Sequence, residues 1–336
     1  MRVERPNGRA SWHPTRDLGA RTQNYPCTKA CFWVVRPKSC RCSCVQGLAM
    51  TTRKGPDMTN VKQPTTNDDE PAAPVAAWDA IAALYDEHVA PGESDLAIAG
   101  LRLAGLQAGD TFLDVAAGTG GLSLPAARLG ATVLATDWAP KMIEHFNARA
   151  GAEGLDAVGR AMDCHALDIA DNTYDLTGSQ FGVMLVPDQA QALREMVRVT
   201  KPGGRVLLIA YGNPDEFEAL HFFVGAVQAV VPEFEGPAED EPMLEFQIAD
   251  PEVLRRRLIE AGLNDVTVDT SNHERIEVRN GQQLWDWCLG GNPIPGMLVA
   301  DLTDEQRADI IRVLDGMIRE HSADGPAVLT APLNIG

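Results

Sequence analysis

Two glycines and one carboxylate near the middle of the chain have the spacing of a site for a nucleoside-containing cofactor. Gly118 and Gly120 fall in a turn of small residues, where the missing Cβ lets a ligand approach the backbone closely. The helix predicted after this turn would direct its free N–H groups and the positive end of its dipole at the ligand. Asp137 ends the next apolar run, and a carboxylate at a strand tip can accept hydrogen bonds from both hydroxyls of a ribose.

Two types of cofactor fit this arrangement. A dinucleotide fingerprint needs a third glycine three residues after Gly120, but Ser123 occupies that position. An NAD(P)-dependent oxidoreductase is therefore the less favoured interpretation, and it remains an alternative. The run LDVAAGTG from Leu113 to Gly120 instead resembles motif I of the class I S-adenosylmethionine-dependent methyltransferases, roughly (L)D-x-(G/A)-x-G-x-G.

Four later segments follow in the order and spacing of that family. They read MDC at 162–164, NTYD at 172–175, SQFG at 179–182 and EMVRVTKPGGR at 195–205. They are most similar to the subgroup typified by the ubiquinone/menaquinone-biosynthesis methyltransferases, in which an alanine often replaces the first motif glycine, as Ala116 does here. The resemblance covers about residues 75–336 and implies that the cofactor is S-adenosyl-L-methionine.

The resemblance also implies which residues contact the cofactor. Asp114 would help to hold the amino group of the methionine part, Asp137 would bind the ribose hydroxyls, and Asp163 would accept from the adenine amino group. Ser179 and Gln180 would lie under the sulfonium and the methionine carboxylate. The other contacts would come from backbone groups and packing side chains, namely Tyr85, Ala116, Gly118, Gly120, Trp138, Met142 and Cys164, with Trp78 beside Tyr85 as a lid.

Structural roles remain open for several of these residues. Asp114 could bond to the backbone of the glycine turn, and this is compatible with a cofactor role. Asp137 could instead cap the helix that starts near Pro140. Core packing is an equal alternative for the aromatic and methionine side chains Trp78, Tyr85 and Met142.

The elements that must position these residues alternate between strand and helix patterns. Strands are predicted at 111–116, 132–137, 158–163, 174–181 and 204–211, and helices at 76–90, 94–106, 120–129, 140–153 and 187–200. Short β–α connections predict an α/β fold with a doubly wound, mostly parallel sheet. The class I methyltransferase fold implied by the resemblance has seven strands, and in such sheets the ligand lies beyond the carboxyl ends of the strands.

The part after residue 212 is predicted to add a helical and aromatic lid, with elements at about 213–250 and 280–325. The expected order is an aromatic helix near Phe217–Val227, an acidic loop 233–245, a helix 251–262, a strand pair 266–270 and 275–278, a helix with Trp285 and Trp287, a loop 290–296, a helix 303–320 and a final antiparallel strand 327–335. The aromatic side chains would roof an apolar pocket for a small organic acceptor.

The first 74 residues differ in composition from the remainder, and they are predicted to be a disordered leader and linker. Residues 1–49 carry nine Lys/Arg against two acids, a net of +7, which leaves −25 for residues 50–336 out of the whole-chain −18. Met50 or Met58 could be the true start. Zinc binding is a less favoured alternative, because no C-x-x-C pair occurs among Cys27, Cys31, Cys40, Cys42 and Cys44.

The strongly acidic domain argues against a nucleic-acid partner, since a phosphate backbone requires a positive face. No apolar run reaches the ~20 residues that span a bilayer. The two remaining cysteines, Cys164 and Cys288, are far apart in the sequence, which is consistent with reduced thiols in the cytoplasm. A small-molecule substrate is therefore the expected partner.

No catalytic group is predicted. Methyl transfer from a sulfonium needs mainly orientation, because the leaving group is already activated, and a base is needed only if the acceptor must lose a proton. The weak candidates for such a base are His165, His221 and His273. No metal-ligand spacing is present, so no metal is expected. A non-catalytic, cofactor-binding protein of the same fold remains a second alternative.

Overall fold

The structure is a computed structural model that describes residues 73–234, 236, 243–322 and 325–336. The predictions made for residues 1–72, namely a disordered leader, a start at Met50 or Met58 and no zinc site, lie outside the described residues. The same is true of most of the predicted acidic loop, at 235 and 237–242. None of the described helices combines the length and the apolar character that crossing a bilayer requires.

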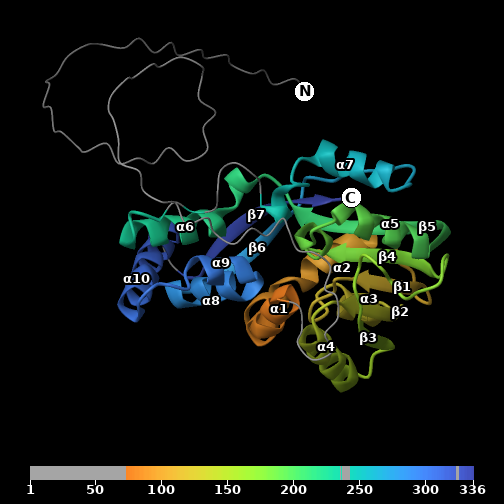
Figure 1. Cartoon of the computed structure of the whole chain (residues 1–336), viewed down its shortest axis with the longest axis horizontal. Helices are drawn as coiled ribbons and strands as arrows, with labels where there is room; N and C mark the ends of the chain where they lie inside the picture. Colours follow the sequence, from red (N-terminus) through yellow and green to blue (C-terminus); the bar gives the residue numbers. More distant parts are fainter. Residues whose placement is uncertain (1–72, 235, 237–242, 323–324) are drawn as a thin grey trace, which may run out of the picture. The chain divides into compact units, whose positions relative to one another are not determined.

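One sheet of seven strands organises the described part of the chain (Figure 1). Its order is β3-β2-β1-β4-β5-β7-β6. The strands are β1 (Thr111–Val115), β2 (Thr132–Asp137), β3 (Ala157–Ala161), β4 (Tyr174–Gln180), β5 (Thr200–Tyr211), β6 (His273–Val278) and β7 (Ala327–Ile335). The first five strands pair in parallel, whereas β7 is antiparallel to both of its neighbours, β5 and β6. This topology confirms the predicted doubly wound, mostly parallel seven-stranded fold.

The helices that connect these strands match most of the predicted ranges. They are α1 (Ala73–Leu84), α2 (Ser94–Leu103), α3 (Ser123–Arg128), α4 (Pro140–Glu153), α5 (Gln189–Val199), α6 (Glu218–Val230), α7 (Pro251–Glu260), α8 (Gly281–Gly291), α9 (Pro293–Leu298) and α10 (Asp304–His321). Local signals set several ends. Pro140 occupies the first turn of α4 and Gly154 ends it in a left-handed conformation, while Thr303 and Gln306 form a capping box at α10.

The apolar side chains form two main clusters. The larger one packs along the parallel strands and includes Phe112, Leu176 and Ile209. The second lies between α6, α8, α10 and the antiparallel strands, and includes Phe223 and Trp285. Figure 1 shows these helices gathered beside β6 and β7. The predicted lid is therefore a layer with a core of its own.

Two predicted elements of the lid are wrong. Residues 266–270 do not form a strand with 275–278, because β6 pairs with β7 instead and only one isolated bridge, Asp269 to Ile335, joins the earlier segment to the sheet. Residues 290–296 are not simply a loop. Asn292 caps a short helix, its Oδ1 accepting from the backbone N–H of Ile294 at 2.9 Å, and Pro293 fits the first turn.

Candidate functional site

The candidate site lies where the strand order reverses, between β1 and its neighbour β4. The turn after β1 has three residues in the left-handed region, Ala116 at φ 54°, Gly118 at φ 55° and Gly120 at φ 99°. A Cβ on Gly118 would lie 3.5 Å from the ring of Tyr85, and one on Gly120 would lie 2.4 Å from the ring of Phe146. Gly118 therefore faces the site, whereas Gly120 allows the turn to pack against α4.

Asp137 holds this turn from the tip of β2. Its Oδ2 accepts from the backbone N–H of Gly118 at 2.8 Å, and its Oδ1 accepts from that of Ala139 at 2.8 Å, next to the start of α4. Burial raises the pKa of the carboxyl. The side chain thus bonds to the backbone at both oxygens while it lines the cavity described below, so the structural and the ligand-binding interpretations are compatible.

Asp114 lies behind the turn and does not line the cavity. Its Oδ2 accepts from the Ser123 hydroxyl at 2.6 Å, and its Oδ1 has no partner within the described residues. Burial raises the pKa of this carboxyl to about 7, and the nearby carboxyls of Asp137 and Glu93 add to the shift. The predicted role of Asp114, to help hold the amino group of the methionine part, often through water, stays a prediction.

A second buried acid, Glu93, lies on the cavity side of the turn. It is 2% exposed, and its Oε1 accepts from the Tyr85 hydroxyl at 2.6 Å. Its Oε2 comes so close to the backbone that a Cβ on Gly121 would collide with it. Burial raises the pKa of Glu93 to about 7. Sequence reasoning missed this residue, because a single acid between Gly92 and α2 carries no motif.

Gln180 ends β4 next to the glycine turn, where a Cβ on Gly121 would lie 3.4 Å from its Nε2. Both of its amide atoms are buried, and neither has a partner within the described residues, although the side chain lines the cavity. Burying a primary amide without hydrogen-bond partners is unfavourable for folding, unless a bound ligand supplies the missing hydrogen bonds. Ser179 points elsewhere, because its Oγ accepts from the backbone N–H of Val183 at 3.0 Å, and it does not line the cavity.

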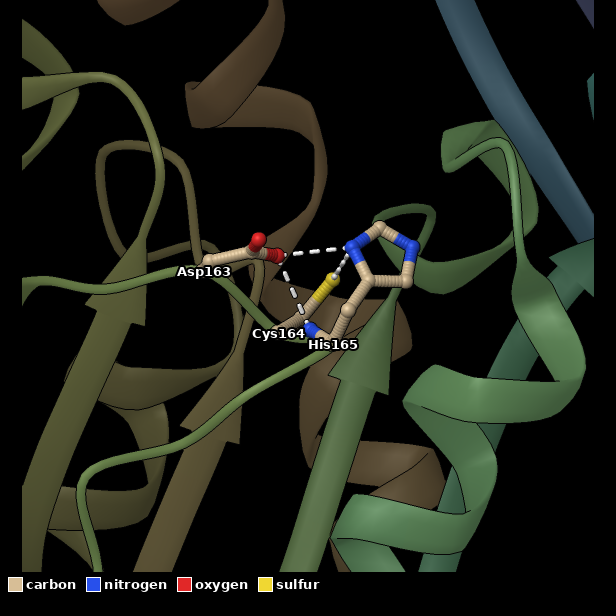
Figure 2. A group of neighbouring side chains, drawn as sticks. All are labelled: Asp163, Cys164 and His165. Atoms are coloured by element: carbon tan, nitrogen blue, oxygen red, sulfur yellow. Dashed lines mark hydrogen bonds and ion pairs between the residues drawn. The ribbon is translucent and has the colours of Figure 1, made fainter. Parts of the chain in front are cut away.

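Three adjacent side chains after β3 form a compact cluster (Figure 2). Oδ1 of Asp163 accepts from both the backbone N–H and the Nδ1 of His165, at 2.9 and 2.7 Å, as the dashed lines in Figure 2 show. Burial raises the pKa of the Cys164 thiol to about 12, and Asp163 contributes to the shift. In this structure the carboxylate of Asp163 and the Nδ1 of His165 are hydrogen-bonded to each other. The expectation of no metal stays a prediction.

These residues surround one cavity of about 260 Å³. Of the predicted cofactor contacts, the residues that line it are Tyr85, Ala116, Gly118, Asp137, Trp138, Met142, Cys164 and Gln180, together with Trp78. Asp114, Gly120, Asp163 and Ser179 do not, because each is turned into the packing or hydrogen bonds described above. The cofactor contacts expected of these four residues, often through water for Asp114 and through the backbone for Gly120, stay predictions.

The same cavity continues under the lid. There its wall is aromatic: the rings of Phe181 and Tyr211 stack at 4.6 Å, those of Tyr211 and Phe217 lie 4.6 Å apart, and Trp287 meets Phe217 edge-on at 6.3 Å. We call this part, which also includes Met184, Leu244, Glu245 and Asn292, the acceptor lobe. No Lys, Arg or His side chain within the described ranges lines the cavity.

The three histidines considered as bases all lie outside this lining. His221 on α6 and His273 at the start of β6 are exposed, and His165 is bonded to Asp163. Two hydrogen-bonded titratable pairs reach the cavity: Tyr85 with Glu93, both of which line it, and Tyr211 with Glu274, of which Tyr211 lines it. The Tyr211 hydroxyl donates to Oε2 of Glu274 at 2.9 Å, and burial, with help from Glu93, raises the pKa of Glu274 to about 8. The sequence carried no signal for this pair, since β6 was expected to pair with a different segment.

Comparison with known proteins gives a partial match. Residues 113–208 match the family model described as a methyltransferase domain. The chain is 44% identical over 108 residues to an uncharacterized protein of Mycobacterium tuberculosis, covering 32% of this chain and 39% of that protein. It is 36% identical over 140 residues to a ubiquinone/menaquinone biosynthesis C-methyltransferase of Bdellovibrio bacteriovorus, covering 40% of this chain and 59% of that protein.

A third relative is matched over a longer stretch. The demethylmenaquinone methyltransferase of Paenarthrobacter aurescens is 29% identical over 185 residues, which cover 53% of this chain and 72% of that protein. The chain spans less than two thirds of the length of the first two relatives. The family match ends before Tyr211, so the acceptor lobe is built largely from residues outside it.

Proposed function

The chain carries a class I S-adenosylmethionine-dependent methyltransferase domain, and we propose that it transfers a methyl group from this cofactor to a small, largely apolar metabolite. A quinone, phenol, polyketide or lipid-like precursor fits this description. The observation that carries the proposal is the continuity of one cavity, which joins the strand-end residues Asp137 and Gln180 to the aromatic residues of the lid. A donor bound at one end would lie next to an acceptor bound at the other.

The residues of the cofactor end suit this donor. Asp137 has further lone pairs for ribose hydroxyls, Gly118 leaves room at the turn, and the unpaired amide of Gln180 can bond to the methionine carboxylate. Glu93 places a carboxyl where the positive charges of the methionine part would be tolerated. When bound, S-adenosylmethionine supplies an activated methyl group on a sulfonium. The acidic lining, without Lys, Arg or His among the described residues, is complementary to that charge.

The contribution of the chain to the reaction is chiefly orientation. The rings of Phe181, Tyr211 and Phe217 form an aromatic wall of the acceptor lobe, against which a flat acceptor can lie. Methyl transfer would require the lid residues to hold the attacking atom in line with the methyl group. The name of one relative refers to ubiquinone/menaquinone biosynthesis and that of another to demethylmenaquinone, which supports an aromatic or quinonoid acceptor here.

The two alternative functions are disfavoured by specific contacts. In an NAD(P)-dependent oxidoreductase the third fingerprint glycine packs tightly, whereas Ser123 here donates to a buried carboxyl. A non-catalytic partner protein has no need of an apolar lobe that continues from the cofactor end of the cavity. We further propose a cytoplasmic location, supported by the two buried free thiols Cys164 and Cys288.

Calorimetry and a methylation screen test the proposal. The purified full chain is expected to bind S-adenosylmethionine and S-adenosylhomocysteine but not NADH. Labelled methyl groups from S-adenosylmethionine should then enter a compound of a metabolite extract or of a panel of quinones, phenols and polyketides. Binding of NADH with no affinity for the sulfonium cofactor would reject the proposed class, and cofactor binding without transfer to any acceptor would favour the non-catalytic alternative.

A further inference from the structure

One carboxyl group lies in the apolar wall of the acceptor lobe. Glu245 belongs to a short 3-10 turn, Leu244–Phe246, is 8% exposed and lines the cavity. Its Oε2 has no hydrogen-bond partner within the described residues, and its Oε1 has only a long contact of 3.4 Å with Nδ2 of Asn292. A buried carboxyl oxygen without a partner is unfavourable in a folded protein.

The turn that carries Glu245 is held firmly in place. Gln189, itself buried, donates from Nε2 to the carbonyl of Met184 at 2.7 Å and to that of Leu244 at 2.9 Å. Its Oε1 accepts from Nη1 of Arg257 at 2.7 Å, which fixes the orientation of the amide. The position of Glu245 therefore follows from a defined set of hydrogen bonds.

The other polar groups of the lobe already have partners. The Tyr211 hydroxyl donates to Glu274, and the Asn292 side-chain oxygen accepts from the backbone of Ile294. The remaining wall consists of aromatic and aliphatic side chains. Oε2 of Glu245 is thus the side-chain oxygen that this lobe offers to a bound molecule, among the residues that the structure describes.

We propose that Glu245 binds a hydrogen-bond donor carried by the acceptor, an ammonium or a hydroxyl group attached to an apolar body. This inference rests on the proposed function, because it names the acceptor of that same site. The Asn292 amide nitrogen faces Oε1, so this carboxyl already accepts from one donor. Burial raises the pKa of Glu245, and an ammonium bound beside it would favour the ionised form, which accepts hydrogen bonds and donates none. No Lys, Arg or His side chain of the described residues lines the cavity, and this disfavours an anionic acceptor.

Four probes with one apolar body can test this. Phenylbutylamine, phenylbutanol, benzylacetone and butylbenzene offer an ammonium, a hydroxyl, a carbonyl and no polar group. Their affinities would be measured by calorimetry on the full chain saturated with S-adenosylhomocysteine. The amine or the alcohol should bind at least about tenfold more tightly than butylbenzene and benzylacetone, the order expected for a hydrogen bond to a charged group. The amine and alcohol arms separate the two kinds of donor.

Variants distinguish a ligand contact from a structural role. Glu245→Leu should abolish the preference while butylbenzene binds as well as before, and the nearly isosteric Glu245→Gln should reduce it most for the amine. Glu260→Leu, at an exposed residue of α7, is the matched control and should change nothing. Equal binding of all four probes by the unmodified chain, no binding of any probe, or a uniform loss in both Glu245 variants would overturn the proposal.

The proposed function is checked separately in the same samples. Affinity for S-adenosylmethionine, measured without probes, should be unchanged in both Glu245 variants. Donor selectivity without any affinity for this cofactor would retain the Glu245 site and reject methyl transfer. Cofactor binding without donor selectivity would reject the Glu245 site alone.

Discussion

Ser123 donates a hydrogen bond from Oγ to Oδ2 of Asp114 at 2.6 Å, and both side chains are buried behind the glycine turn. The serine stands at the position where a dinucleotide fingerprint has its third glycine. Its hydroxyl pairs a carboxyl oxygen that glycine would leave without a partner. Serine in place of the fingerprint glycine thus gives the buried Asp114 carboxyl a hydrogen-bond donor.

Replacing this serine by glycine tests that relationship. Ser123→Gly recreates the G-x-G-x-x-G spacing, yet it should not create affinity for NADH, because the remaining cavity is unchanged. The unpaired Asp114 oxygen should lower the free energy of unfolding by about 1–3 kcal/mol. Urea denaturation and calorimetry with NADH measure the two effects. A stable variant that binds NADH would show that the serine decides cofactor choice.

Loss of the Asp137 carboxylate should weaken cofactor binding. Asp137→Ala removes hydrogen bonds to a charged group, so the affinity for S-adenosylmethionine should fall by about 1.5–3 kcal/mol, or roughly 10- to 150-fold. The melting temperature of the free protein should also fall, because the backbone N–H groups of Gly118 and Ala139 lose their acceptor. Calorimetry and thermal melts report the two separately.

Asp163→Ala is the comparison variant for Asp137→Ala. The Asp163 side chain bonds to His165 and does not line the cavity, so Asp163→Ala should lower the affinity for S-adenosylmethionine less than Asp137→Ala does. If Asp137→Ala lowered the melting temperature and left the affinity unchanged, Asp137 would be a structural residue and the ribose would bind elsewhere.

Alanine at Gly120 should be much more disruptive than alanine at another glycine of positive φ. Gly120 has φ 99° and a Cβ there would lie 2.4 Å from Phe146, so Gly120→Ala should cost about 2–5 kcal/mol of stability. Gly154 has φ 66° at the end of α4 with nothing within 4 Å, so Gly154→Ala should cost only about 1–2 kcal/mol. Equal losses in urea denaturation would contradict the packing role assigned to Gly120.

The buried acids predict a pH dependence of stability. The folded-state pKa values of Asp114 and Glu93 are raised to about 7 and that of Glu274 to about 8. The folded state therefore holds protons that the unfolded chain has lost, and stability should fall as the pH rises from about 5 to about 8. Glu274→Gln should flatten the upper part of this profile in chemical denaturation. A stability that rises over that range would show these groups to be ionised in the folded state.

Local signals made much of the parallel half of the fold predictable. The bounds of α4 were predicted at 140–153 and match, because Pro140 and Gly154 define its ends within the sequence. The period and turn chemistry of β2 likewise fixed its range. Pairing in the lid could not be predicted in this way. Residues 266–270 have the pattern of a strand, but the partner that β6 selects lies some fifty residues later, in β7.

The site was predictable to the extent that it follows strand ends. Asp137 and Gln180 line the cavity because they end β2 and β4, whose tips meet at the point where the strand order reverses. Glu93, Glu245 and Glu274 were missed, since what distinguishes them from surface acids is their burial in the folded chain. Their burial depends on contacts between segments that are far apart in the sequence. No local sequence pattern indicates such contacts.

Because β7 lies between β5 and β6, the sheet can be completed only after residues 327–335 have been translated. Among the described strands β7 is the last to leave the ribosome, yet it supplies Ala327, Leu329 and Ala331 to the core under the lid. Until then β5 has an open edge and β6 has no partner in the sheet. We therefore expect the parallel strands to pack first, and the core under the lid to form only when residues 327–335 insert between β5 and β6.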